Sequence, residues 1–385
     1  DRLPRSTIDA DAPDDARGQR LRVPGGGGCG MNFLTGLLNR IGSPEDLIVS
    51  SGKLCVQLYV AQTAVTAGEA TVELGGETFE SEALRDTALA DLTKRLNDLK
   101  LALIGNIESD ADEERCQRLG AAVVKHGFAR SLVQVVMVLP LEPRKDATHV
   151  FSNLVRRDIG DFAQHVADDE MILDALVHNL DGPPDLAVSC SAMIREAAKA
   201  EVVAAALLES DSFWKFFTTY VHVKNFDVAA DAFEILKFLL TGFPARAAAF
   251  IAHRYDTFFQ HYNTLLEADN YVTCRESVRL LGEVLLDRAN FNSMMKYIGS
   301  RDNLKILMIL LRNKKIRIQI EAFHVFKVFV ANPRKPPEIV KILHANKDKL
   351  VAYLKNFTHD KADDQFNEEK ALIIETLQAL DTAEP

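Results

Sequence analysis

Hydrophobic residues recur at steps of three and four along most of the chain after Met31, which is the period of helices with one buried face. The stretch 270–291 shows this most clearly. Its predicted buried face consists of Cys274, Ser277, Val278, Leu281 and Leu285. A second face carries Tyr271, Arg275 and Arg279 at steps of four. Because protein interfaces favour aromatic and arginine side chains, this face is a candidate surface for a partner.

The same periodicity predicts helices along the rest of the chain. Ser43 followed by Pro44 and two acids is a typical helix start. The predicted helices cover about 43–62, 81–106, 110–125 and 131–139, and near the end about 338–346, 347–357 and 367–380. Residues 66–82 interrupt the pattern with three glycines, and an inserted loop is favoured there over a short hairpin.

Five helical segments of the second half align with one another. They begin at Asp146, Leu186, Phe226, Tyr271 and Ile316, spaced by 40, 40, 45 and 45 residues. The seventh position of each segment is small: Ser152, Ala192, Ala232, Ser277 and Ala322. A small residue in mid-helix suggests close packing against a neighbouring helix. A period of 40–47 residues is that of armadillo and HEAT repeats.

The predicted fold class is therefore all-α, an armadillo- or HEAT-like helical-repeat solenoid forming a curved rod or horseshoe. Glycine and proline clusters fall between the aligned segments, as at Gly182–Pro184 and Gly242–Pro244. Residues 31–385 are expected to form a single helical-repeat domain with the 66–82 loop inserted. Residues 1–30 contain few large apolar residues and end in a glycine run, so we expect a disordered extension or expression-derived residues.

Composition narrows the class of protein. The formal net charge of −10 disfavours a nucleic-acid binder, and no apolar run reaches the length of a membrane span. The five cysteines are widely spaced and form no CxxC pair, which indicates neither a zinc site nor a disulfide framework. Reduced cysteines and the absence of a visible secretory signal favour a cytoplasmic protein.

No catalytic motif is present, and the ten histidines are scattered, so we expect neither an enzyme, a metal site nor a cofactor. The aromatic cluster 213–217 is most simply part of the core, with Lys215 pointing outward. The basic run 312–317 has two interpretations that the sequence leaves open. It is either a solvated turn between helices or a patch for an acidic peptide, and a nuclear-localisation signal is a weaker third.

The stretches 270–291 and 321–335 closely resemble the calcium-binding protein thirty-nine family, the Hym-like mouse-protein-twenty-five kinase scaffolds. Residues 151–160, 255–266 and 363–370 are similar to the same family, and the resemblance covers about 146–380. It implies a horseshoe-shaped scaffold without enzymatic activity that allosterically activates sterile-twenty-type kinases or pseudokinases. Despite the family's name, the sequence shows no calcium site, and the acids near Asp9 lack the pattern of an EF-hand.

The resemblance also implies two partner-binding surfaces. The concave face that clasps the kinase would be carried by Phe226, Tyr271, Arg275, Arg279, Arg288 and Phe291. Arg279 stands where the family usually has Lys, which keeps the charge and changes the donor geometry. A C-terminal peptide pocket for a Trp-Glu-Phe-like tail would be carried by Met308, Arg312 and Lys349.

The sequence thus predicts a non-catalytic signalling scaffold that binds and activates a kinase or pseudokinase. The alternative is a generic helical-repeat protein-interaction adaptor in cell division or trafficking without kinase activation. The joint presence of Tyr271, Arg275, Arg288, Phe291 and Met308 favours the first hypothesis.

Overall fold

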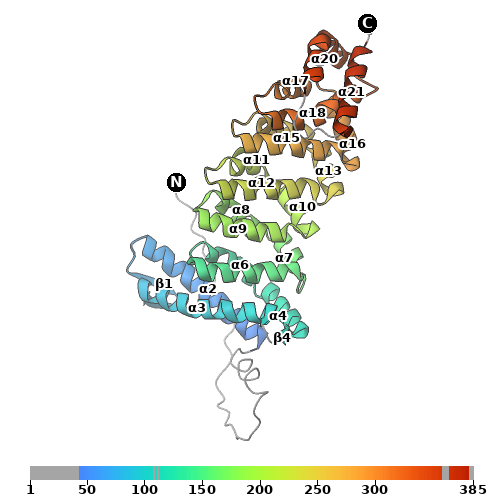
Figure 1. Cartoon of the computed structure of the whole chain (residues 1–385). Helices are drawn as coiled ribbons and strands as arrows, with labels where there is room; N and C mark the ends of the chain where they lie inside the picture. The colour runs from blue at the N-terminus through green and yellow to red at the C-terminus, as the bar shows by residue number, and fades with distance from the viewer. Residues whose placement is uncertain (1–42, 107–108, 111, 358–363, 381–385) are drawn as a thin grey trace. The chain divides into compact units, whose positions relative to one another are not determined.

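The computed structural model describes residues 43–106, 109–110, 112–357 and 364–380, and it is all-α with a helical-repeat architecture (Figure 1). The chain divides into two compact units, residues 1–162 and 163–385. Residues 1–30 lie outside the described part. The prediction of a single domain over 31–385 and of a rod or horseshoe outline stays a prediction.

The first unit consists of long helices with two short hairpins between them. Its elements are α2 (Pro44–Thr66), β1 (Thr71–Leu74), β2 (Glu77–Glu80), α3 (Ser81–Ile104), β3 (Gly105–Asn106), β4 (Ser109–Asp110), α4 (Glu113–Lys125), α5 (Phe128–Val136) and α6 (Leu141–Arg156). The helix start at Ser43 is confirmed. Its hydroxyl accepts from the Asp46 amide at 3.1 Å, and the Asp46 carboxylate accepts from the Ser43 amide at 3.3 Å.

The connection between α2 and α3 is a β-hairpin, so the prediction of a loop over 66–82 is wrong. β1 and β2 pair antiparallel from Thr71 opposite Glu80 to Leu74 opposite Glu77. Gly75 and Gly76 form the two-residue turn, and both have positive φ angles, 63° and 83°. Two consecutive residues with positive φ match the turn whose twist suits a hairpin, and glycine adopts it without steric cost. The Gly-Gly pair between alternating residues was the signal for the hairpin.

The second unit contains the remaining helices. They are α7 (Phe162–Asp168, which begins at the boundary), α8 (Glu170–His178), η1 (Asn179–Asp181), α9 (Pro184–Ala197), α10 (Glu201–Glu209), η2 (Asp211–Trp214), α11 (Lys215–Thr218), η3 (Tyr220–His222), α12 (Phe226–Thr241), α13 (Pro244–His253), α14 (Tyr255–Leu266), α15 (Tyr271–Leu286), η4 (Arg288–Asn290), α16 (Phe291–Ile298), α17 (Arg301–Leu310), α18 (Ile316–Ala331), α19 (Pro337–Ala345), α20 (Lys347–Asn356) and α21 (Asp364–Gln378).

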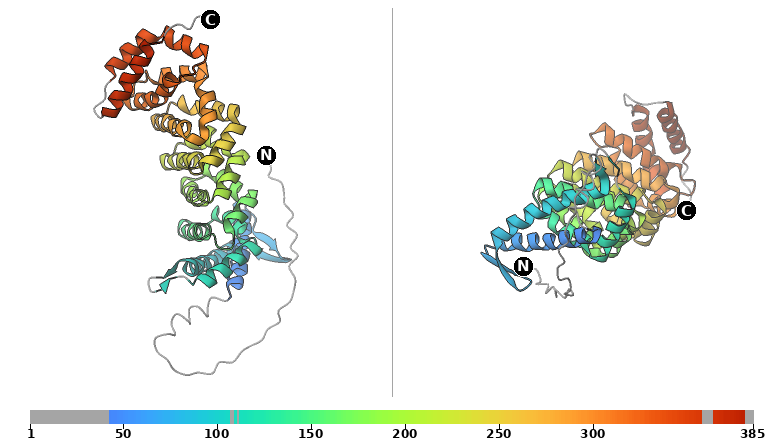
Figure 2. Two further views of the ribbon diagram at one scale, coloured as in Figure 1. Left: turned by 90° about the vertical axis from the view of Figure 1, so that its right-hand side faces the viewer. Right: turned by 90° about the horizontal axis from the view of Figure 1, so that it is seen from below.

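The repeat is visible in the packing of α9, α12, α15 and α18, each of which contacts the next in chain order (Figure 1). The turned view of Figure 2 shows the same helices stacked one after another, from green through orange. In the last three of them the predicted small residues Ala232, Ser277 and Ala322 are completely buried. A larger side chain there would separate adjacent helices, as the sequence pattern predicted.

The register assigned to the two earlier segments is wrong. Ala192 is only half-buried, and the burial pattern of α9 matches that of α12 when Cys190, 42 residues earlier, takes the place of Ala232. In α6 the burial pattern likewise places Phe151 rather than Ser152 at this position. Residues 189–192 are all small, so the small-residue criterion could not distinguish one register from the next.

The core is built of aliphatic and aromatic side chains. Phe213, Phe216 and Phe217 are buried and Lys215 is exposed, which confirms the predicted core role of this cluster. Cys55, Cys116, Cys190 and Cys274 are buried, and none of these four described cysteines forms a disulfide. Among the described residues no single helix has the length and apolarity of a membrane span. The pair α12 and α13 passes that test together, by length and composition, but it is bent by 91°.

Candidate partner-binding site

Helix α15 is fixed by its cap and by its buried face. The Asn270 side chain accepts from the amides of Val272 and Thr273 at 2.9 and 3.2 Å, which satisfies two donors of the first turn. The predicted buried residues Cys274, Ser277, Val278, Leu281 and Leu285 are all buried. The hydroxyl of buried Tyr262 in α14 donates to the Ser277 carbonyl at 2.9 Å. The opposite face of α15 is therefore held in one orientation.

The three residues of the predicted stripe on that face differ in how firmly their side chains are held. Tyr271 and Arg279 are exposed, and Arg279 Nε lies 3.2 Å from the Glu283 carboxylate one turn on. Arg275 is held more firmly. Its guanidinium nitrogens lie 2.6 Å from Glu276 and 3.3 Å from Glu321 of α18. Arg275 thus bridges two neighbouring repeats, while Arg279 presents its charge to solvent.

Glu321 is the acidic member of this bridge, and its surroundings shift the pKa of its carboxyl. Burial raises the pKa of its carboxyl, and the positive charges of Arg275 and Arg279 oppose that shift. Only 18% of the Glu321 side chain is exposed. The Nε of Arg275 is also buried, and no hydrogen-bond partner for it is present in the described residues. The bridge is therefore a partly desolvated pair in which each side chain depends on the other.

Apolar side chains extend the surface on either side of α15. Phe226 is the first residue of α12 and is 67% exposed, and Phe291 is the first residue of α16 and is 59% exposed. Arg288 in η4 is exposed as well. Helix α15 has 16 residues and is about 24 Å long. Tyr271 and Arg288 therefore lie at opposite ends of it.

Ile316 is an exposed apolar residue that the sequence analysis did not include among the candidate surface residues. It is the first residue of α18 and is exposed, as Phe226 and Tyr271 are at the first positions of α12 and α15. The 45-residue spacing of the three positions was the signal that connects them. A row of exposed apolar residues on adjacent helices is typical of a protein interface.

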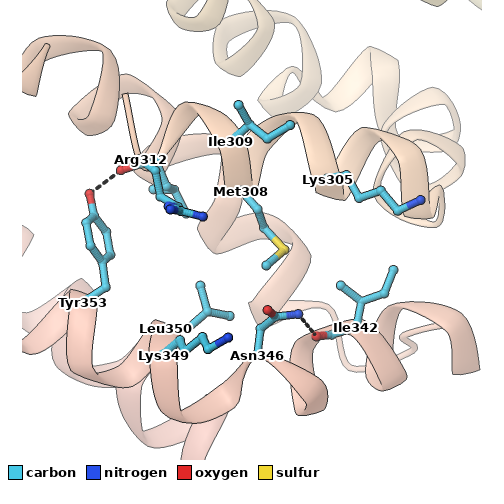
Figure 3. Close-up of a pocket in the computed structure, with 10 residues that line it drawn as sticks. Lys305, Met308, Ile309, Arg312, Ile342, Asn346, Lys349, Leu350 and Tyr353 are labelled. Carbon is cyan, nitrogen blue, oxygen red and sulfur yellow. Dashed lines mark hydrogen bonds between the residues drawn. The ribbon is translucent and has the colours of Figure 1, made fainter. Parts of the chain in front are cut away.

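Met308, Arg312 and Lys349 meet in one cavity of about 760 Å³, as Figure 3 shows. Lys305, Met308, Ile309 and Arg312 come from one face of α17 and its end, at steps of three and four. Ile342, Asn346, Lys349, Leu350 and Tyr353 approach from α19 and α20. The thioether of Met308 lies between the two groups (Figure 3).

The chemistry of the cavity is apolar with a positive rim. Lys305, Arg312 and Lys349 line it together with Met308 and aliphatic residues, and none of its ten lining residues is acidic. Lys305 lies 3.1 Å from Asp302, whereas no ion pair of Arg312 or Lys349 is recorded in the described residues. Such a cavity suits an aromatic or aliphatic group that carries a carboxylate.

Tyr353 forms one wall of the cavity. Its hydroxyl donates to the Leu311 carbonyl at 2.5 Å and lies 3.2 Å from the Gln319 side-chain oxygen. Burial raises the pKa of Tyr353 to about 12, so the phenol stays neutral and can keep donating at neutral pH. Lys349, Leu350 and Tyr353 share one face of α20. The sequence analysis named only the first of these three.

A comparison with protein families matches the Mo25-like model to residues 64–381. The chain belongs to the Mo25-like family. Over 303 residues it is 41% identical to a putative Mo25-like protein of Arabidopsis thaliana, covering 78% of this chain and 88% of that one. It is 39% identical to calcium-binding protein 39-like of Homo sapiens (78% and 90% covered) and 38% identical to a Mo25-like protein of Schizosaccharomyces pombe (75% and 89%).

The Mo25-like match extends further toward the N-terminus than the sequence analysis placed the resemblance. It begins within α2 rather than near residue 146, so the β1–β2 hairpin lies inside the matched range. Within the described residues of this Mo25-like chain, no group of three or more His, Cys, Asp or Glu side chains is arranged to hold a metal ion. The acids near Asp9 lie outside the described residues.

Proposed function

We propose that this Mo25-like protein is a non-catalytic cytoplasmic scaffold that binds and allosterically activates a sterile-twenty-type kinase or pseudokinase. The kinase lobe would lie on the surface of Phe226, Tyr271, Arg279, Arg288 and Phe291, with Arg275 holding α15 against α18. A C-terminal tail of the partner, similar to Trp-Glu-Phe, would enter the cavity of Met308, Arg312 and Lys349.

The observation that carries this proposal is the cavity itself. The family resemblance named Met308, Arg312 and Lys349, which lie up to 41 residues apart on α17, in the turn after it and on α20, and all three line one cavity. A Trp-Glu-Phe tail has two aromatic rings, one side-chain carboxylate and one terminal carboxylate. The apolar wall suits the rings, and the unpaired cations suit the carboxylates. A volume of about 760 Å³ also lies within the roughly 300–1,000 Å³ of ligand sites.

Activation would follow from a difference in affinity. A scaffold that binds the active kinase conformation more tightly than the inactive one shifts the population toward the active form. A tenfold shift needs about 1.4 kcal/mol of differential binding free energy. The exposed apolar residues of α12, α15 and α16 offer contact area of this order, because burying one large apolar side chain contributes roughly 1.5–3 kcal/mol.

The tail interaction is tested by calorimetry with a peptide that ends in Trp-Glu-Phe. We expect Met308→Ala to weaken binding about tenfold or more, because it removes the side chain between the two walls of the cavity. Met171→Ala is the matched control, since Met171 of α8 is 58% exposed and lies outside the cavity. Equal affinities of the wild type and Met308→Ala would exclude this cavity as the tail site.

A further inference from the structure

A second cavity, of about 590 Å³, adjoins the proposed tail pocket. The two cavities share Ile309 and Arg312 as lining residues, so no protein wall thicker than one side chain separates them. Ile309 is 69% exposed and forms the ridge between them. The second cavity is also lined by Tyr271, which connects it to the stripe on α15.

The side chains of the second cavity are mainly cationic. Arg312, Lys314 and Lys315 line it, against a single acid, Asp269. In the described part of the chain no ion pair is recorded for any of these three cations, although many other surface cations have one. Three of the four cations in the basic run 312–317 therefore line a cavity without an ion-pair partner in the described residues.

Lys315 occupies the N-cap position of α18, where helix stability alone would favour a capping residue such as Asn. The equivalent residues before α12 and α15 are Asn225 and Asn270, and both cap their helices with side-chain hydrogen bonds. Lys315 precedes α18 in the same place, 45 residues further on, and makes no side-chain cap. The repeat thus forgoes a stabilising cap here and places a positive charge at the cavity.

We propose that the second cavity binds acidic residues that immediately precede the aromatic end of the partner's tail. This inference rests on the proposed function of the first pocket and adds a sequence requirement to its ligand. The aromatic end occupies the cavity of Met308 and Lys349, the chain crosses Ile309, and two to four Asp or Glu side chains lie against Arg312, Lys314 and Lys315. An extended segment advances about 3.3 Å per residue, so four residues span about 13 Å.

The test compares two twelve-residue peptides that both end in Trp-Glu-Phe. One has four acidic residues directly before this end, and the other has Ser and Gln in their place. We expect calorimetry to show about tenfold tighter binding of the acidic peptide, equal to about 1.4 kcal/mol. The difference should shrink as salt rises from 50 to 500 mM, because these cations are exposed to solvent.

Three variants test whether Lys314 and Lys315 cause the preference for the acidic peptide. Lys314→Gln and Lys315→Asn should each reduce the preference for the acidic peptide, and the double variant should abolish it while the Ser/Gln peptide binds as before. Lys315→Asn restores the cap of α18, so thermal unfolding should show no loss of stability. Lys355→Gln on α20, an exposed cation outside both cavities, is the matched control and should leave the preference unchanged.

The outcomes separate the two proposals. If both peptides bind the wild type with equal affinity, the second cavity has no role in recognition, and the first pocket stands. If the double variant keeps the full preference, the acidic residues bind elsewhere and the inference is wrong. If neither peptide binds, the tail pocket fails and this inference fails with it.

Discussion

Arg275 of α15 reaches Glu321 of α18, with 3.3 Å between Nη2 and Oε1, and so connects two repeats through side chains 46 residues apart. The family resemblance assigns Arg275 to the kinase surface. In the structure its guanidinium is already paired with Glu276 and Glu321. Arg275 therefore positions α15 against α18, so under the proposed function its replacement would change the packing of the kinase surface as well as any direct contact.

We expect Arg275→Ala to lower the free energy of unfolding by roughly 1–3 kcal/mol, because it leaves the mostly buried Glu321 without its cation. The double variant Arg275→Ala with Glu321→Gln should recover part of this loss, since the neutral amide is less costly to bury. Urea unfolding of the four proteins of the cycle measures the coupling. Strictly additive effects would show that the pair contributes nothing to stability.

The raised pKa of Glu321 gives this pair a pH dependence. Because burial raises the pKa in the folded state above its ordinary value of 4.5, the folded protein binds the proton more tightly than the unfolded chain. The contribution of this group to stability therefore falls as the pH rises from 4.5 through the folded-state pKa, and it stays constant above. Relative to Glu321→Gln, the wild type should gain stability as the pH falls through that window in urea unfolding. A difference that is independent of pH would contradict the assignment.

The periodic and local features of this fold could be predicted from the sequence, because their signals lie within a few residues of each other. The helix start at Ser43, the buried face of α15 and the 45-residue spacing of α12, α15 and α18 are of this kind. The pairing of Arg275 with Glu321 could not, since no local pattern connects them. The β1–β2 hairpin was missed although Gly75 and Gly76 gave a local signal for it.

The cavity of Met308, Arg312 and Lys349 shows a second reason why a site cannot be predicted from sequence patterns alone. Lys305, Met308 and Ile309 share one face of α17, and Arg312 continues that face in the turn after it, which the spacing alone indicates. That this face meets α19 and α20 depends on how successive repeats pack, and single-sequence patterns contain no such information. Only the family resemblance named Lys349 beside Met308 beforehand, and it did not include Tyr353 or the adjoining cavity.

Ser277 tests the role of the small residue at the seventh position. Its hydroxyl is buried, and no hydrogen-bond partner is present among the described residues. We expect Ser277→Ala to leave stability unchanged or raise it by up to about 1 kcal/mol, because a buried hydroxyl without a partner is unfavourable. Ser277→Leu should destabilise by about 1–3 kcal/mol or more through overpacking between α15 and its neighbours. Thermal and urea unfolding of both variants decide this, and a stable Ser277→Leu protein would contradict the close-packing argument.

Gly120 in α4 tests a close approach in the first unit. A Cβ at this position would lie 2.6 Å from the Ile159 carbonyl oxygen and 2.3 Å from its Cγ2. We therefore expect Gly120→Ala to cost about 3 kcal/mol, measured by urea unfolding, despite the better helix propensity of alanine. Gly52→Ala in α2 is the control. Its Cβ would meet only Phe128 at 3.8 Å, so stability should rise by about 0.5–1 kcal/mol.

Lys315→Asn is expected to stabilise the protein. Asparagine would restore at α18 the cap that Asn225 and Asn270 provide at α12 and α15, and such a cap contributes about 0.5–2 kcal/mol. The substitution also removes one of the three neighbouring positive charges of Arg312, Lys314 and Lys315, which should raise the free energy of unfolding further. A rise in the midpoint of thermal unfolding would confirm that Lys315 is retained for a reason other than stability. A lower midpoint would show that the lysine supports the fold.

Kinase activation itself is best tested with side chains that do not support the fold. Phe291 is highly exposed. Within the part of the chain that the structure describes, the one ion pair of Arg279 is the surface pair with Glu283, which contributes at most about 0.5 kcal/mol. We expect Phe291→Ala with Arg279→Ala to abolish activation of a cognate sterile-twenty-type kinase in a reconstituted assay while leaving thermal unfolding unchanged. Leu372→Ala on α21 is the control for loss of exposed apolar surface, since this leucine is 60% exposed. Full activation by the double variant would exclude this surface as the site of kinase activation. If the wild type binds the kinase without activating it, the protein is a simple adaptor.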